Sequence, residues 1–510
     1  MSKPSDAPVP PSPPRRQLWP LAGLTTAGTR GSGAVRGTKI VATLGPATDR
    51  CLPELLEAGV NVCRINFSHG TADEHRTRVA AVKAACRSSG RMVALLGDLQ
   101  GPKIRIGQFQ AGDITLVPEQ AFTIDADLAA DAGTAEAVGT TYATLAQDLE
   151  SGDVLILGDG LIELKVESIH GTATRCRVLT GGNLGGGKGI NKRGGGLSAA
   201  ALTAKDRDDI TLAAELGVDF LAVSFPRSAE DMVQARELAA AAGLDCRLVA
   251  KLERAEAVAD ERTLTDLILA SDAVMVARGD LGIEIDYPAL MGVQKFVLAE
   301  ARRLGRATIT ATQMMESMIN NPVPTRAEVL DVANAVVDGS DAVMLSGETA
   351  VGDHPVATVE AMVRVIEGAE ASAEFPAGRL RDAPCEAVDE AIALAVMSVA
   401  ARLDRVAAVV CFSASGNTPK LLSRYLSRIP IYAMIEDPKT LARVALYRGV
   451  EPVLFTPREQ DYEAMNRQAL DWLKEQNLVH PGDRVILAKG DLREERRPGG
   501  TNTMKVVTID

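Results

Sequence analysis

The sequence has little of what marks secreted, membrane-spanning or nucleic-acid-binding proteins. Its seven cysteines include no CxxC pair, so we expect reduced thiols and a cytoplasmic protein rather than a disulfide framework. No segment has the roughly 18 to 20 uninterrupted apolar residues that a membrane span requires. A net charge of −12 disfavours nucleic acids and anionic membrane surfaces as partners. Small molecules are the partners that remain.

The N-terminal segment also lacks the pattern of a folded element. Residues 1–36 are rich in Pro, Ser, Gly and Thr, which is typical of a disordered tail. The arginine pair at 15–16 faintly resembles a twin-arginine export signal. However, Pro20 and Gly23 interrupt the apolar stretch that follows, and export is not favoured.

What the sequence does contain is a regular alternation of β-branched runs and helical stretches. Ala-, Leu- and Glu-rich patterns such as 229–242 separate most of the runs, as in parallel βα units. Eight such units predict an α/β fold of the (β/α)₈ barrel type, built from residues 37–106 and 205–370. The expected strands are 39–44, 62–67, 92–97, 220–224, 247–251, 273–277, 307–312 and 342–345.

Two further segments fall outside this repeat. Residues 107–204 show short β-rich runs between Gly and Asp turns, and we expect a small β domain inserted into a barrel loop. Residues 371–510 alternate again and predict a third, α/β domain. Its expected strands are 407–412, 431–433, 451–455, 485–487 and 504–508.

Polar residues gather at the predicted ends of the barrel strands. In such a barrel the loops after the strands converge on one face, where the chemistry takes place. Charged groups at nearly every strand end therefore predict a polar, phosphate-sized pocket with metal-binding capacity. The residues concerned are Arg64, Asn66, Ser68, His69, Asp98, Lys251, Glu253, Arg278, Gly279, Asp280, Thr312, Ser346 and Glu348.

Three of these residues form a pattern suited to phosphoryl transfer. Glu253 and Asp280 follow adjacent strands, and a carboxylate pair suits Mg²⁺, which keeps several of its waters. Lys251 alternates with Leu252 and is expected to point toward the same mouth. A lysine beside Mg²⁺ can stabilise the charge of a transferring phosphoryl group. The alternative is a structural Lys–Glu ion pair at the barrel rim.

At these residues the sequence resembles the pyruvate kinase family. The resemblance implies a (β/α)₈ TIM barrel with an inserted small β-barrel lid domain and a C-terminal α/β regulatory domain. It also implies transfer of the phosphoryl group of phosphoenolpyruvate to ADP, with Mg²⁺ or Mn²⁺ as cofactor and a homotetramer as the assembly. The matching segments are KIVATLGPAT (39–48), RINFSHG (64–70), GDLQGPKIRIG (97–107), VAKLERAEAV (249–258), MVARGDLGIEI (275–285) and the long run from ATQMMESM to VGDHP (311–355).

The resemblance also implies roles for individual residues. Arg64 would hold the phosphoryl group of phosphoenolpyruvate, and Lys251 would stabilise that group and the developing enolate. Glu253 and Asp280 would bind Mg²⁺, and Asp280 lies beside the substrate. The substrate carboxylate and the proton route would involve Gly279 and Thr312. The nucleotide phosphates would contact Asn66, His69, Arg105 and Lys205.

A monovalent-cation pocket is the next implied feature. Many family members need K⁺, held at the positions of Asn66, Ser68, Asp98 and the carbonyl of Leu99. In those enzymes the position of Lys103 is usually Glu, and an ammonium there can supply the charge that K⁺ otherwise brings. We therefore expect K⁺-independent activity. The alternative is that Lys103 is an ordinary solvated lysine.

The third domain carries a candidate effector site. Residues 411–422 predict a strand, a Ser/Gly/Thr loop and a helix, a pattern that offers N–H groups and hydroxyls to an anion. The resemblance implies a phosphate-binding loop for an allosteric sugar phosphate, and an ordinary βα turn is the alternative. The loop at 489–502 mixes acidic and basic residues, which puts a bisphosphate in doubt. The effector residues would be Ser413, Ser415, Gly416, Asn417 and Thr418.

Other readings stay open at this point. The glycine-rich stretch 181–196 lacks the GK[ST] ending of a P-loop and is interpreted as a flexible connection leaving the inserted domain. A barrel lyase or aldolase could use Glu253 and Asp280 but would not need Lys251 or the nucleotide contacts. A catalytically inactive relative could act as a metabolite sensor through its third domain.

Overall fold

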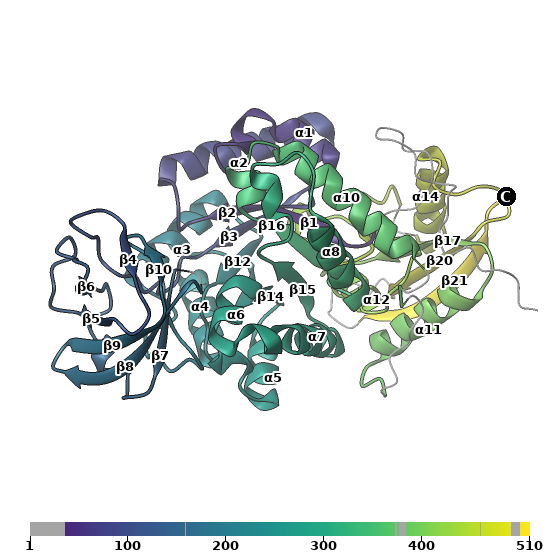
Figure 1. Ribbon diagram of the computed structural model, residues 1–510. Coiled ribbons are helices and arrows are strands. Elements are labelled where there is room, and N and C mark those ends of the chain that lie inside the picture. The colour runs from purple at the N-terminus through teal and green to yellow at the C-terminus, as the bar shows by residue number, and fades with distance from the viewer. Residues whose placement is uncertain (1–35, 159, 373–374, 377–383, 460, 491–499) are drawn as a thin grey trace, which may run out of the picture. The chain divides into compact units, whose positions relative to one another are not determined.

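The fold comes from a computed structural model (Figure 1) that describes residues 36–158, 160–372, 375–376, 384–459, 461–490 and 500–510. The predicted disordered tail therefore lies outside the described residues, apart from residue 36. The same is true of most of the mixed-charge loop, at residues 491–499. No described helix is both long enough and apolar enough to cross a membrane.

Eight parallel strands close into a barrel in the order β1-β16-β15-β14-β13-β12-β3-β2. The (β/α)₈ barrel predicted from the eight βα units is thus confirmed. The ends of each expected barrel strand agree with those of an observed strand to within about two residues. Figure 1 shows these strands surrounded by helices. The barrel strands are β1 (Lys39–Thr43), β2 (Val62–Asn66), β3 (Ala94–Asp98), β12 (Phe220–Val223), β13 (Arg247–Leu252), β14 (Ala273–Ala277), β15 (Ala307–Ala311) and β16 (Ala342–Leu345).

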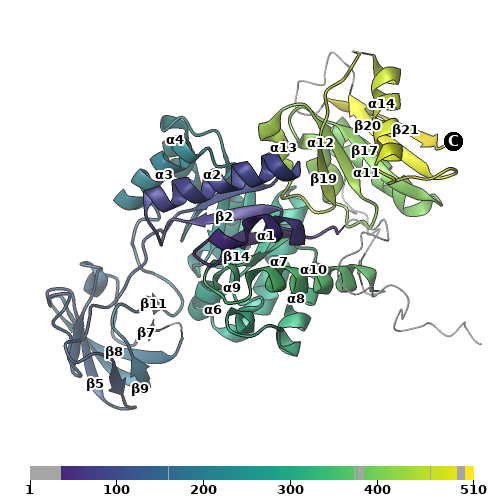
Figure 2. The same cartoon turned by 90° about the horizontal axis from the view of Figure 1, so that it is seen from above.

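The helices around the barrel begin and end at clear sequence signals. The helix α2 begins after Thr71, whose hydroxyl accepts from the Glu74 amide in a capping box, and ends at the left-handed Gly90. The helix α8 uses Thr325 and Glu328 in the same way. In Figure 2, α2, α3 and α4 run along one side of the barrel. The barrel helices are α1 (Leu52–Ala58), α2 (Ala72–Ser89), α3 (Ala204–Leu216), α4 (Ala229–Ala241), α5 (Glu261–Ala270), α6 (Arg278–Ile285), α7 (Tyr287–Arg303), α8 (Arg326–Asp338), α9 (Gly347–Ala350) and α10 (Pro355–Ala371).

The chain between β3 and α3 forms a separate β structure with its own apolar core. That core includes Phe122, Ile124, Leu164 and Cys176. Its strands form a six-stranded sheet in the order β11-β7-β8-β9-β5-β6 and a two-stranded sheet of β10 and β4. The strands are β4 (Ile114–Leu116), β5 (Ala121–Asp125), β6 (Ala137–Gly139), β7 (Val154–Leu157), β8 (Ile162–His170), β9 (Ala173–Thr180), β10 (Gly182–Leu184) and β11 (Ile190–Lys192).

The C-terminal part is a five-stranded sheet with helices. Its strand order is β19-β18-β17-β20-β21, and only the β20–β21 pair is antiparallel. The strands are β17 (Val406–Phe412), β18 (Ile431–Ile435), β19 (Val450–Leu454), β20 (Arg484–Gly490) and β21 (Thr501–Thr508). The helices are α11 (Val388–Arg402), α12 (Asn417–Ser423), α13 (Pro438–Val444) and α14 (Tyr462–Glu475).

Candidate active site

The carboxyl ends of three barrel strands bring a group of charged side chains into contact. Arg64 is in β2, Asp98 ends β3, and Lys251 is near the end of β13. The Nε of Arg64 donates to Oδ2 of Asp98 at 2.6 Å, and Nζ of Lys251 lies 3.2 Å from Oδ1 of Asp98. The same Nζ lies 2.9 Å from Oε1 of Glu253. Two cations and two carboxylates therefore meet at the mouth of the barrel.

The charges in this group stabilise one another against burial. Burial acts to lower the pKa of Lys251, but the negative charges of Asp98 and Glu253 outweigh it and raise that pKa above its usual value. Burial acts in the opposite sense on Asp98, yet Arg64 and Lys251 hold the pKa of that carboxyl below its usual range. Both Lys251 and Asp98 are therefore charged at neutral pH.

The carboxylate of Glu253 lies near that of Asp280. Glu253 is 2% exposed, and its Oε2 accepts a hydrogen bond from the Phe225 amide at 2.9 Å. Burial, together with the nearby charge of Asp280, raises the pKa of Glu253 to about 7 although Lys251 opposes the rise. The carboxylate of Asp280 is thus close enough to that of Glu253 to raise its pKa. No residue in the described part of the chain donates a hydrogen bond to the Asp280 carboxylate, so its oxygens are available to a ligand.

The donor set fits Mg²⁺ better than a metal that needs an all-protein cage. The described residues contain no cluster of three or more His, Cys, Asp or Glu side chains with metal-binding geometry. Mg²⁺ is commonly bound by one or two carboxylates together with waters and substrate phosphates. The buried carboxylate of Glu253 and the half-buried carboxylate of Asp280 match that requirement.

The start of α6 and the end of β15 form the next wall of the site. The Gly279 amide donates to Oγ1 of Thr312 at 2.9 Å. Thr312 has φ of 66°, a conformation that is an outlier for a β-branched residue and is often found at active sites. Arg278 holds this turn by donating to the carbonyls of Ala311 at 3.2 Å and Thr312 at 2.7 Å. An amide and a hydroxyl are thereby fixed side by side.

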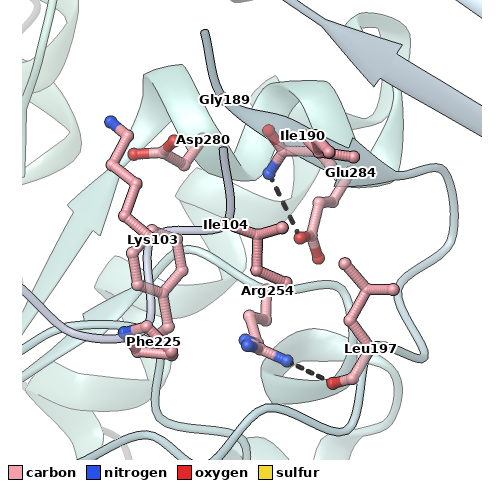
Figure 3. A pocket seen from close by; sticks show the side chains of 11 residues that line it. Lys103, Ile104, Gly189, Ile190, Leu197, Phe225, Arg254, Asp280 and Glu284 are labelled. Carbon is pink, nitrogen blue, oxygen red and sulfur yellow. Dashed lines mark hydrogen bonds between the residues drawn. The ribbon is translucent and has the colours of Figure 1, made fainter. Parts of the chain in front are cut away.

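A small cavity of about 20 Å³ opens beside these groups (Figure 3). Asp280 and Lys103 both line it, and both are drawn in Figure 3. The lining residues are Pro102, Lys103, Ile104, Gly189, Ile190, Asn191, Leu197, Phe225, Arg254, Asp280 and Glu284.

Comparison with known families shows which protein family the chain belongs to. A family model described as pyruvate kinase, barrel domain, matches residues 35–359, and one described as pyruvate kinase, alpha/beta domain, matches residues 390–507. The chain belongs to the pyruvate kinase family. It is a phosphotransferase, and its substrates are phosphoenolpyruvate and ADP.

Individual relatives agree over nearly their full length. A pyruvate kinase of Haemophilus influenzae is 52% identical over 462 residues, covering 90% of this chain and 96% of the relative. A protein named pyruvate kinase II from Salmonella typhimurium is 50% identical over 482 residues, covering 94% and 100% of the two chains. A pyruvate kinase of Mycobacterium tuberculosis is 40% identical over 457 residues, covering 89% of this chain and 95% of the relative.

The structure brings together only some of the residues assigned to the nucleotide by resemblance to pyruvate kinases. Lys205 donates to the carbonyl of Phe67 at 2.7 Å, which places it beside the loop that carries Asn66 and the exposed His69. Arg105 instead donates to the carbonyl of Gly187 of the inserted domain at 2.9 Å. No contact between Arg105 and the other three residues appears in the described part of the chain.

The residues of the expected monovalent pocket lie at neighbouring strand ends. Asn66 and Asp98 are register partners in β2 and β3, and Oδ1 of Asn66 accepts from the Ser68 amide at 3.1 Å. The Leu99 carbonyl accepts from the hydroxyl of Ser224 at 2.7 Å. Asp98 also pairs with two cations of the site, Arg64 and Lys251.

The candidate effector loop joins β17 to α12, as the sequence predicts. Gly416 has φ of 78°, and its amide donates to Oγ of Ser413 at 3.0 Å. The Asn417 amide group donates to Asp389 at 2.7 Å, and the Thr418 hydroxyl lies 2.5 Å from that of Thr501. The hydroxyl of Ser415 accepts a hydrogen bond from the backbone amide of Asn417, within the same loop, at 3.4 Å.

Two polar residues of the site were missed by sequence reasoning. Ser224 accepts a hydrogen bond from Lys251 Nζ at 2.7 Å, and Thr43 accepts one from Arg64 Nη1 at 2.9 Å. Ser224 was expected as the last residue of a strand and Thr43 as the next to last. The rule that polar strand ends mark the site would therefore have found both.

Proposed function

We propose that the cluster of Arg64, Lys251, Glu253 and Asp280 carries out phosphoryl transfer from phosphoenolpyruvate to ADP. The observation that carries the proposal is the position of Lys251, whose Nζ lies 2.9 Å from Glu253 and 3.2 Å from Asp98. These contacts fix a buried ammonium beside two acidic side chains at the mouth of the barrel. A barrel lyase would have no need for such an ammonium or for a nucleotide site.

In this proposal different residues bind different groups of the substrate. Arg64 and Lys251 bind the phosphoryl oxygens, whose negative charge grows more diffuse as the phosphorus leaves the enol oxygen. The bond from that oxygen to phosphorus breaks, and a β-phosphate oxygen of ADP forms the new bond. Lys251 then faces the enolate that remains.

The substrate carboxylate binds where α6 begins. The Gly279 amide and the Thr312 hydroxyl are already 2.9 Å apart, and a helix N-terminus favours an anion. Thr312 would also take part in the proton uptake by the enolate carbon that gives pyruvate. The strained φ of 66° at Thr312 keeps its hydroxyl in place for both roles.

Glu253 and Asp280 would hold Mg²⁺, or Mn²⁺ in its place. The bound ion supplies positive charge that neutralises phosphate oxygens and orients the phosphoryl group. The nucleotide phosphates would bind at Asn66, His69 and Lys205, which lie together. Arg105, at the hinge before the inserted domain (residues 107–204), would reach them when this lid closes and excludes water.

We further infer that the enzyme does not require K⁺. Lys103 and Asp280 line the same cavity, so the ammonium of Lys103 is near the position where the extra positive charge is needed. Among the described residues, none is an ion-pair partner for its Nζ. The positions of Asn66, Ser68, Asp98 and Leu99 would then form a pocket in which K⁺ adds little.

Regulation and assembly complete the proposal. A sugar phosphate, and a monophosphate as readily as a bisphosphate, would bind at Ser413, Ser415 and Gly416, with Asn417 and Thr418 released from their present partners. A homotetramer in the cytoplasm is consistent with three apolar side chains that are 59 to 65% exposed on neighbouring helices α7 and α8. They are Tyr287, Met291 and Leu330.

The test is the rate of ATP formation from phosphoenolpyruvate and ADP with Mg²⁺, measured with and without KCl and across a panel of sugar phosphates. We expect ATP formation in K⁺-free buffer, less than about twofold stimulation by KCl, and activation by at least one sugar phosphate. Large stimulation by KCl would contradict the role of Lys103. No ATP formation in any buffer would contradict the function itself.

A further inference from the structure

The lid returns to the barrel through a short glycine segment that both parts of the molecule hold. We call residues 194–197 the return segment. Just before it, the Arg193 amide donates to the Val154 carbonyl of the lid at 2.9 Å. Just after it, the Ser198 amide donates to Asp148 of the lid at 2.8 Å. The return segment itself is bound from the barrel side.

Three charged residues of the barrel bind the return segment. Oε1 of Glu256 accepts from the Gly196 amide at 2.5 Å. Arg254 Nη1 donates to the Leu197 carbonyl at 2.7 Å, and the contact is drawn in Figure 3. The backbone carbonyl of Glu284 accepts from the Gly194 amide at 2.8 Å. In the bonds to Glu256 and Arg254 the partner is a charged group, which makes them stronger than neutral ones.

The glycines of the return segment make these close contacts possible, in addition to giving the backbone flexibility. Gly195 has φ of 76°, and a Cβ added there would lie 2.5 Å from Oε2 of Glu256. The carboxylate thus occupies the space that any side chain at this position would need. Oε2 is buried and has no hydrogen-bond partner among the described residues. The fit between Glu256 and Gly195 is therefore close and specific.

The same residues are tied to the expected metal ligands. Arg254 directly follows Glu253, and Glu284 lies one helical turn after Asp280 on α6. Oε2 of Glu284 accepts from the Ala255 amide at 2.8 Å, and its Oε1 accepts from Asn191 of the lid at 3.4 Å. A displacement of β11, the last strand of the lid, would therefore move the two segments that carry the expected metal ligands Glu253 and Asp280.

We propose that Arg254, Glu256 and Glu284 form a latch that fixes the lid's return segment to the barrel and so positions the lid over bound nucleotide. They are positioning residues, because they contact the lid and not the reacting atoms. The inference rests on the proposed function in one respect only, the identity of the nucleotide. Phosphoenolpyruvate binds on the barrel itself, whereas ADP needs both barrel and lid, so loss of the latch affects ADP most.

The test compares full-length enzyme with Glu256→Ala and with Glu237→Ala as a matched control, since Glu237 is an exposed glutamate on α4. Hydrogen exchange is measured on peptides covering residues 191–200. Loss of a charge-assisted bond is expected to speed exchange of these amides by about tenfold or more. Steady-state assays should show the KM for ADP raised by about three- to tenfold and the KM for phosphoenolpyruvate changed by less than about twofold.

A second variant keeps the inference testable if Glu256→Ala folds poorly. Gly195→Ala should displace the carboxylate and give the same pattern of effects. The double variant Gly195→Ala/Glu256→Ala should be no worse in KM for ADP than the more impaired single variant, because both act on one contact.

The outcomes separate the latch from the proposed function. Unchanged exchange at residues 191–200 in both single variants, or equal rises in the two KM values, would overturn the latch while ATP formation stands. Absence of ATP formation in the unsubstituted enzyme would overturn the proposed function, and the exchange comparison would still report on the latch.

Discussion

Two groups of buried charges, one at each end of the barrel, differ in how completely they are paired. At the amino-terminal end, Asp341 precedes β16 and is 2% exposed. It accepts hydrogen bonds from Arg424, from the Arg448 amide at 3.0 Å and from the Thr308 amide at 3.0 Å. Arg448 in turn donates to Glu370 at 2.7 Å. These pairs fasten the barrel to the C-terminal sheet.

At the opposite end the pairing is incomplete. Lys251 and Asp98 are fully engaged, but the carboxylate of Asp280 has no donor among the described residues, and Lys103 faces a cavity. The comparison teaches that burial of charge alone does not mark a site. Here the active site is distinguished by half-buried charged groups, Asp280 and Lys103, whose partners are left for a ligand to supply, as expected for a preorganised electrostatic environment.

The largest expected effect is at the mouth. Lys251→Met removes the buried ammonium, and turnover should fall by roughly 10²- to 10³-fold, the scale for losing one group that stabilises transition-state charge. Turnover is measured by coupled ATP formation, with circular dichroism to check the fold. Lys165→Met, which changes an exposed lysine of the lid, should leave turnover unchanged. Full turnover in Lys251→Met would refute its assigned role.

A substitution at the amino-terminal end of the barrel, which we call the base, should lower stability and leave turnover unchanged. Asp341→Asn leaves Arg424 without its anionic partner and is expected to cost about 2–3 kcal/mol of unfolding free energy. Urea unfolding measures the loss, and Asp471→Asn on the exposed face of α14 is the control. Turnover per folded molecule should be unchanged. A fall in turnover without a fall in stability would show that the base contributes to catalysis and would break the comparison.

A smaller effect is expected at the edge of the mouth. Lys103→Glu reverses one charge beside the cavity, and activity in K⁺-free buffer should fall by about tenfold, equivalent to about 1.4 kcal/mol. Adding KCl should restore most of it, whereas the unsubstituted enzyme should respond by less than about twofold. A variant that is equally active with and without KCl would show that the charge at position 103 does not replace K⁺.

The sequence predicts the barrel well because hydrophobic period and strand-end chemistry are local properties. Lys251, Glu253 and Asp280 were placed at one mouth because parallel strands end on the same face. Their contact in the structure, 2.9 Å between Lys251 and Glu253, follows from that rule and from the period of two along β13.

Contacts between distant segments were beyond such reasoning. The fit of Glu256 against Gly195 depends on how the lid returns to the barrel, and the glycine stretch alone suggests only flexibility. The left-handed turn at Thr312 and Gln313 is likewise unexpected for those residue types, and Arg278 stabilises it from another strand end. Arg105 donates to Gly187 of the lid, and sequence spacing carries no information on that contact.

A last expected effect concerns pH and lies at the amino-terminal end, the base, of the barrel. Asp219 precedes β12, and its carboxylate accepts from the Leu95 amide at 2.8 Å. Burial raises its pKa to about 6, although that hydrogen bond and the charges of Arg443, Lys439 and Lys83 oppose the rise. The folded state therefore binds this proton more tightly than the unfolded state does.

The sign of the effect follows from linkage. The stabilising contribution of protonated Asp219 is complete below its ordinary pKa of 3.8 and is lost as pH rises through about 6. Asp219→Asn keeps an oxygen for the Leu95 amide but cannot ionise. Between pH 4 and 7, the stability of the unsubstituted enzyme should fall relative to the variant by about 1–2 kcal/mol. Urea unfolding across this range measures the difference, while the pH profile of turnover should be the same in both proteins. A changed turnover profile with parallel stability curves would place the titrating group at the mouth and not at the base.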